Sequence, residues 1–119
     1  MRILFDHGTP VDLRHVLSKH EVTTAKRQGW DRLSNGQLLG AAEAEGFDVL
    51  LTTDGNIRYQ QNLSERRIAI LVLTDCTKWE QVRKHADRIY AAVDGIERSG
   101  YIEVSIPYPD QEDKASRIV

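Results

Sequence analysis

Short apolar runs alternate with segments of helical periodicity along the whole chain. The runs predict five strands, at residues 2–6, 21–25, 47–53, 67–74 and 101–106. The third and fourth runs are apolar almost throughout, which is typical of parallel strands covered on both faces. The fifth alternates between apolar and polar positions and ends at Pro107, which indicates an edge strand.

Helices are expected in the four gaps between these strands. Cap residues and apolar spacing place them at residues 9–18, 34–46 and 58–63, followed by a long helix from Asp75 or Thr77 to Val93. This order predicts an α/β fold, a three-layer α/β/α Rossmann-like sandwich with a mainly parallel sheet of about five strands. Its crossovers are expected to be right-handed. We expect one domain over residues 1–106 and a flexible charged tail over 107–119.

Composition narrows the class of protein. The chain has 119 residues, 40% of them hydrophobic and 29% charged, which is typical of a globular domain. No apolar run is long enough to cross a membrane, and Met1 leads into no secretory signal, so a cytoplasmic protein without a membrane partner is expected. Cys76 is the single cysteine, which rules out a disulfide within the chain. The net charge of −2 argues against a basic surface all around the protein, although local basic clusters remain.

Two acids at strand ends are the main candidates for chemistry. Asp6 closes the first expected strand and Asp54 follows the third. Ligands of open parallel sheets bind beyond the carboxyl ends of the strands, and neighbouring carboxylates there suit Mg²⁺ or Mn²⁺. The structural alternative is that Asp6 is an anion at a helix start and that Asp54 forms an Asx turn. Both interpretations remain open on the residues alone.

Other motifs are weaker. No glycine-rich nucleotide loop is present, the four histidines lack zinc spacing, and no serine lies in a nucleophile elbow. The run from Arg58 to Asn62 offers a cation, a phenol and three amides. Such side chains bind phosphate, stack on bases and read base edges in single-stranded RNA, although a polar helix face would have the same composition.

Three segments together resemble a known family. They are Ile3 to Pro10, Gly29-Trp30 followed by Ser34-Asn35, and Phe47 to Asn56. In order and spacing they resemble the PIN-like family of uncharacterised proteins over about residues 1–75. That family is similar to PIN-domain ribonucleases, to VapC-type toxins and to the Mut7-C group. The resemblance implies a Rossmann-like sandwich and metal-dependent RNA cleavage.

The resemblance also implies roles for particular residues. Asp6 and Asp54 match the acids at the first and third strand ends and would hold the metal. The family often has acids where this chain has Asn35 and Asn56, and often Glu where it has His7. A third acid could come from the middle helix, where Glu43 is the candidate. The acidic site is therefore expected to be reduced.

Three hypotheses follow. The first is an Mg²⁺- or Mn²⁺-dependent ribonuclease, the toxin of a toxin–antitoxin pair, with an antitoxin protein as partner. Its metal and catalytic residues would be Asp6, Asp54, Asn35, Asn56 and Glu43, and its RNA-binding residues would be His7, Arg58, Tyr59 and Gln60. The second is a catalytically inactive PIN-like module that binds RNA or a partner protein. The third is an interaction protein that forms a homodimer through the long helix and the edge strand.

Overall fold

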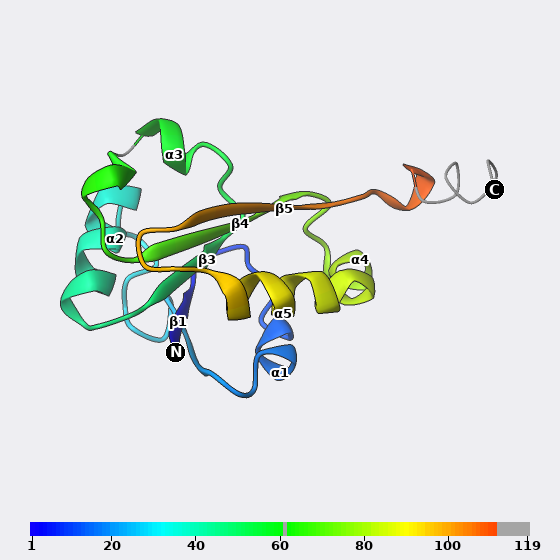
Figure 1. Ribbon diagram of the computed structural model, residues 1–119, viewed down its shortest axis with the longest axis horizontal. Helices are drawn as coiled ribbons and strands as arrows, with labels where there is room; N and C mark the ends of the chain where they lie inside the picture. The colour runs from blue at the N-terminus through cyan, green and yellow to red at the C-terminus, as the bar shows by residue number, and fades with distance from the viewer. Residues whose placement is uncertain (61, 112–119) are drawn as a thin grey trace.

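One sheet organises the protein, and every strand in it pairs in parallel with its neighbours. The computed structural model describes residues 1–60 and 62–111. Five strands lie in the order β2-β1-β3-β4-β5 (Figure 1). Their bounds are β1 Arg2–Phe5, β2 Glu21–Thr24, β3 Val49–Thr52, β4 Ala69–Asp75 and β5 Tyr101–Ile106. The expected parallel α/β sheet is confirmed.

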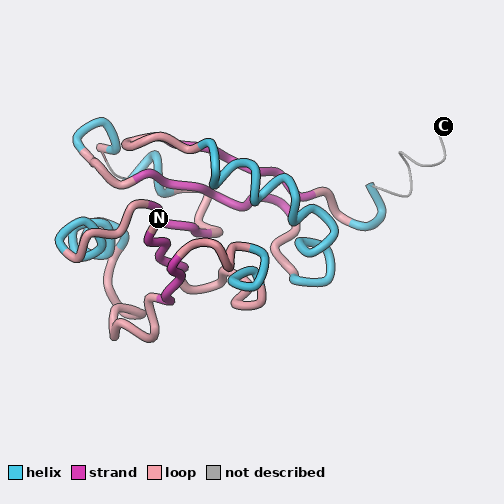
Figure 2. The backbone as a smooth tube through the Cα atoms, turned by 60° about the horizontal axis from the view of Figure 1, so that its bottom comes forward, coloured by secondary structure: helices cyan, strands magenta, loops and turns pink. Residues whose placement is uncertain are grey.

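Short helices connect the strands and cover both faces of the sheet. Helices α1 and α5 share a core with one face, while α2 and α3 share a core with the other. Helix α5 runs along the strands on its face (Figures 1 and 2). In the described residues the α-helices are α1 Leu13–Val16, α2 Asn35–Ala44, α3 Ile57–Gln60, α4 Trp79–Val82 and α5 Ala86–Gly95, with 3-10 helices η1 Leu63–Glu65 and η2 Arg83–His85.

Alternate residues of the strands build two apolar layers. On one face Leu71 of β4 packs in a cluster with Leu13 of α1 and Ile89 of α5. On the other face its neighbour Ile70 belongs to a cluster with Leu39 of α2. Because successive side chains of a strand point to opposite faces, a strand covered on both sides must be apolar at nearly every position. This explains the unbroken apolar runs of β3 and β4.

The last crossover differs in hand from its neighbour. The connection from β3 to β4 carries α3 over one face, and the connection from β4 to β5 carries α5 over the other. Both connections move the chain in the same direction across the sheet. Two such crossovers on opposite faces have opposite hands, so one of them is the rare left-handed kind. The expectation that every crossover is right-handed is therefore wrong.

Both ends of α2 are set by local sequence. The Ser34 hydroxyl accepts from the Gln37 N–H at 3.3 Å, and the Gln37 side chain accepts from the Ser34 N–H at 3.1 Å. This capping box fixes the first turn. At the other end Gly46 adopts a φ of 82°, which lets the Phe47 N–H return to the Ala42 carbonyl at 3.0 Å.

Two helix boundaries differ from the sequence expectation. The long helix is divided into α4, η2 and α5 and begins at Trp79, because Asp75 is still part of β4 and has a φ of 67°. The first helix begins at Leu13, since the Thr9 hydroxyl donates to the Leu51 carbonyl at 3.0 Å instead of capping a helix. In both cases the apolar spacing continues through residues that are not α-helical, so periodicity could not reveal the break.

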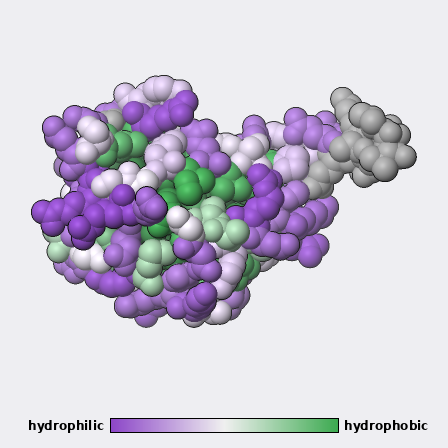
Figure 3. Space-filling model, viewed as in Figure 1, coloured by the Kyte–Doolittle hydropathy of each residue, from purple (hydrophilic) through white to green (hydrophobic). Residues whose placement is uncertain are grey.

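The face drawn in Figure 3 is mostly hydrophilic, with apolar groups gathered near its middle. Within residues 1–60 and 62–111 no helix has the length and apolar character that a membrane crossing needs. Strand β5 ends at Ile106, as expected. Residues 112–119 of the expected tail lie outside the described residues, and so does Gln61 of the helix expected over residues 58–63.

Truncating a core residue of one apolar layer tests this packing. Leu71 is fully buried in β4, an interior strand of the sheet. We expect Leu71→Ala to lower the free energy of unfolding by about 3 kcal/mol, because it removes buried contacts and leaves a cavity. Val11→Ala, at a side chain that is 50% exposed, is the control and should cost less than about 0.5 kcal/mol. Equal urea midpoints for the two variants would contradict the packing described here.

Candidate functional site

The two strand-end acids lie at the point where the strand order reverses. The chain leaves β1 for β2 on one side and then returns to β3 on the other side of β1. Asp6 follows β1 and Asp54 comes two residues after β3, so both lie at the same edge of the sheet. Crevices at such switch points are the usual ligand sites of open α/β sheets.

Asp6 is held by donors on both of its carboxylate oxygens. The His7 N–H donates to Oδ1 at 2.8 Å, and the Thr52 hydroxyl donates to Oδ2 at 2.8 Å. The Asp6 N–H itself donates to the Leu51 carbonyl at 2.9 Å. The carboxylate is therefore anchored to the end of β3 as well as to its own strand.

Asp54 is held in the same way. The Asn56 N–H donates to Oδ1 at 3.0 Å, and the Asn35 side-chain amide donates to Oδ2 at 2.8 Å. The first of these bonds closes an Asx-type turn, which is the structural alternative that the sequence left open for Asp54. The second brings the start of α2 against the end of β3. The Asn35 amide also donates to the Gln60 side-chain oxygen at 2.8 Å.

Thr52 connects the two acids. Its side chain is fully buried, and its hydroxyl donates to Asp6 Oδ2 while accepting from the Asp54 N–H at 3.1 Å. The sequence analysis gave Thr52 no role. The sequence did contain a signal for such a role, since Thr52 is a polar residue at the end of an apolar run. A hydroxyl that is buried there must find hydrogen-bond partners.

The loop after β1 packs closely against β3. Gly8 has a φ of 91°, and a Cβ built on it would lie 2.9 Å from the Thr53 hydroxyl. Only glycine fits this position without strain. The close approach keeps the loop that contains His7 next to the end of β3, although the His7 side chain itself is exposed.

Two of the four expected RNA-binding residues, Arg58 and Tyr59, form an exposed group over β5. Arg58 and Tyr59 contact each other, with the guanidinium 4.6 Å from the ring centroid, and Tyr59 is 72% exposed. Arg58 also pairs with Glu103 at 3.4 Å. Glu103 in turn accepts from the Tyr101 hydroxyl at 2.9 Å. Sequence reasoning missed Glu103, whose only signal was an outward position in an alternating edge strand.

Tyr101 is a fixed donor in this group. Burial, together with the hydrogen bond to Glu103 and the charge of that carboxylate, raises the pKa of Tyr101 to about 12. Its hydroxyl therefore keeps its proton throughout the neutral pH range and continues to orient Glu103. Glu103 thus holds Arg58 over β5.

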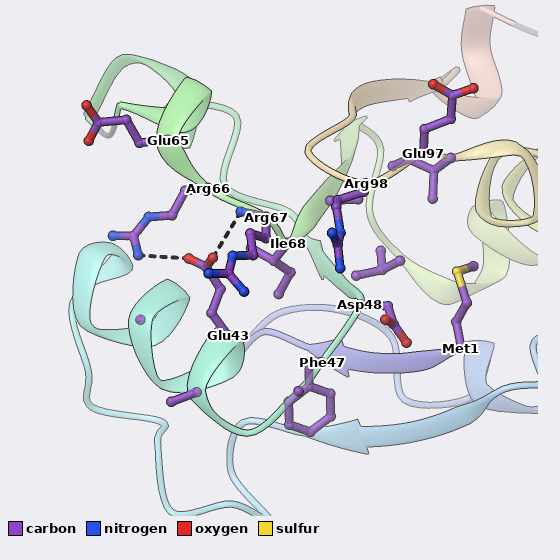
Figure 4. A pocket seen from close by; sticks show the side chains of 16 residues that line it. Met1, Glu43, Phe47, Asp48, Glu65, Arg66, Arg67, Ile68, Glu97 and Arg98 are labelled. Carbon is purple, nitrogen blue, oxygen red and sulfur yellow. Dashed lines mark hydrogen bonds and ion pairs between the residues drawn. The ribbon is translucent and has the colours of Figure 1, made fainter.

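Glu43 does not lie with the other candidate metal-binding residues. It lies in the last turn of α2, two helical turns from Asn35, where it pairs with Arg66 at 2.9 Å and accepts from the Arg67 N–H at 2.9 Å. Figure 4 shows this carboxylate between the two arginine residues. Across residues 1–60 and 62–111, no group of three or more His, Cys, Asp and Glu side chains is placed to hold a metal ion.

The arrangement still offers oxygen ligands. Within residues 1–60 and 62–111, each of the four oxygens of Asp6 and Asp54 accepts one hydrogen bond. A carboxylate has about four lone-pair sites, so each oxygen keeps acceptor capacity for a cation or for water. Asn35 contacts Asp54 through its amide nitrogen, so its side-chain oxygen is a further candidate ligand.

Comparison of the chain with family models, with curated proteins and with solved structures gives no match.

Removing the Thr52 hydroxyl tests its connecting role. Thr52→Val keeps the shape but leaves Asp6 Oδ2 and the Asp54 N–H without this partner. We expect a loss of about 1–3 kcal/mol in the free energy of unfolding. The matched control is Thr53→Val in the next residue, which is only half-buried. If chemical denaturation gave equal losses for both variants, Thr52 would have no special role in the site.

Proposed function

We propose that the protein is a metal-dependent ribonuclease of the PIN-like type, with a reduced acidic site formed by Asp6 and Asp54. One observation carries the proposal. Two half-buried carboxylates at neighbouring strand ends are tied together through the buried Thr52 hydroxyl, at the switch point of a parallel sheet. A structural role for each acid alone would not require this connection.

The donor set fits a hard divalent cation. Mg²⁺ commonly binds through one or two carboxylates and completes its shell with waters and substrate phosphate, so two acids are sufficient. Asp6 and Asp54 would hold Mg²⁺ or Mn²⁺, and the Asn35 and Asn56 side chains could add neutral oxygens, directly or through water. When bound, such an ion activates water and stabilises the charge on phosphate oxygens.

The residues of the chain would orient the RNA and the acids. Thr52 and the N–H groups of His7 and Asn56 hold the carboxylates in place. Arg58 would bind a phosphate and Tyr59 would stack on a base, since both side chains are exposed on α3, the helix whose Gln60 bonds to Asn35. Gln60, connected to Asp54 through Asn35, would contact the same strand of RNA.

The toxin hypothesis adds partners to this proposal. An antitoxin protein would cover the Asp6 and Asp54 edge, and a second copy of the chain would pair along β5. Strand β5 lies at one end of the sheet order, with β4 as its strand neighbour. An uncovered strand edge presents N–H and C=O groups to which another strand can add.

Cleavage of a labelled single-stranded RNA tests the nuclease. We expect Mn²⁺- or Mg²⁺-dependent cleavage that chelation by EDTA abolishes. Asp6→Asn and Asp54→Asn should each lower the rate at least about 100-fold, because each removes a charged ligand from the reacting centre. Asp87→Asn, at an exposed acid of α5, is the control and should retain the wild-type rate. Cleavage that survives both site variants would overturn the proposal.

A second candidate, the inactive RNA-binding module, is favoured by a specific observation. Asn35 turns its amide nitrogen towards Asp54, and Glu43 is paired elsewhere, so the site has two acids. On this hypothesis RNA is bound but never shortened, and Arg58→Gln weakens its binding. Titration of Mn²⁺ into wild type and Asp6→Asn separates the two candidates. Equal and negligible binding heats in both proteins would support the module. A binding heat that is present in the wild type and absent in Asp6→Asn would support the nuclease.

A further inference from the structure

A hollow lies at the opposite end of the sheet from Asp6 and Asp54. It has a volume of about 730 Å³. The end of α2, the start of β3, the segment before β4 and the loop after α5 surround it (Figure 4). Volumes of 300–1,000 Å³ are typical of small-molecule sites. None of the residues proposed for RNA cleavage reaches this hollow except Glu43, which has a structural role here.

Hydrogen bonds hold two loops together at the rim. Ser99, which adopts a φ of 64°, donates its N–H to the Arg67 carbonyl at 2.9 Å and its hydroxyl to the Arg66 carbonyl at 2.6 Å. The Gly100 N–H closes its own turn on the Glu97 carbonyl at 2.8 Å. A Cβ at Gly100 would lie 2.7 Å from that carbonyl, so glycine is required. The segments that carry Arg67 and Arg98 are therefore fixed side by side.

Glu43 forms an ion pair with one arginine and also interacts with the charge of a second, Arg67. It pairs with the Arg66 guanidinium at 2.9 Å and accepts from the Arg67 N–H at 2.9 Å. Burial alone would raise the pKa of Glu43, but these hydrogen bonds and the arginine charges outweigh it and lower that pKa. The carboxylate is thus ionised at neutral pH, and Arg66 is occupied as its partner.

Two guanidinium groups remain available. The Arg67 and Arg98 residues are exposed, and among the described residues no side-chain hydrogen bond or ion pair is found for either. In Figure 4 the Arg98 side chain extends over the hollow and the Arg67 guanidinium lies beside Glu43 in this view, whereas the Glu65 and Glu97 carboxylates point away from the hollow. The remaining acid at the hollow, Asp48, accepts from the Arg2 N–H at 2.8 Å.

We propose that this hollow is a binding site for the phosphate monoester of a small molecule, held between Arg67 and Arg98. Guanidinium groups bind phosphate oxygens through paired N–H donors, and two of them match the charge of a phosphate dianion. The volume exceeds what a phosphate ion fills, which leaves room for the rest of the molecule. The site needs no metal and no residue of the candidate nuclease edge.

Calorimetric titration at low ionic strength tests the site with four probes. They are adenosine 5′-monophosphate, ribose 5-phosphate, inorganic phosphate and uncharged adenosine. We expect both monoesters to bind more tightly than phosphate, and adenosine not to bind. Arg67→Gln and Arg98→Gln should each weaken monoester binding about tenfold or more, since each loses a charge-assisted contact. Arg14→Gln, an exposed arginine of α1, should bind as wild type does.

The controls place the ligand at one end of the sheet. If Arg58→Gln weakens monoester binding while the double variant Arg67→Gln with Arg98→Gln does not, the ligand binds at the RNA site and the proposal is wrong. Absence of binding by any phosphate probe at millimolar concentration also overturns it. Amide shifts in NMR spectra at Arg67 and Ser99 upon adding ribose 5-phosphate, with unchanged spectra around Asp54, would support it independently of the variants.

Discussion

The pairing of β1 with β3 is the constraint on which the candidate site depends. Leu4 lies opposite Leu50 and Phe5 opposite Leu51, and all four are covered from both faces of the sheet. Polar side chains can follow these strands only where the cover ends, and Asp6 comes directly there. Thr52 is the buried exception, tolerated because its hydroxyl is satisfied both as a donor and as an acceptor.

Asn35 determines the electrostatic character of this edge. An acid at this position would face Asp54 with like charge and could not donate a hydrogen bond, whereas the amide donates at 2.8 Å. The chain thus has an amide where a negatively charged ligand would stand. This amide completes a hydrogen-bonded network that runs from Asp6 through Thr52 to Asp54 and Asn35. Such a network holds the two carboxylates in place before any ligand binds, which lowers the cost of binding a cation.

The two ends of the sheet have opposite chemistry. Acids follow the carboxyl ends of β1 and β3, whereas arginines gather before β4 and after α5. Helix α2 spans the distance between these ends, with Asn35 bound to Asp54 at its start and Glu43 bound to Arg66 in its last turn. Its ten residues correspond to about 15 Å, which is why Glu43 cannot join the acids at the other end.

The sequence by itself determined the strands, the parallel sheet and the position of both acids at strand ends, because apolar runs and capping residues are local signals. It also determined the boundaries of α2 through Ser34 and Gly46. Only the tertiary structure decided which residues meet, since contacts such as Thr52 with Asp6 join positions 46 residues apart. The hand of the last crossover, the pairing of Glu43 with Arg66 and the approach of Arg98 to Arg67 depend on how whole elements pack, which no local pattern records.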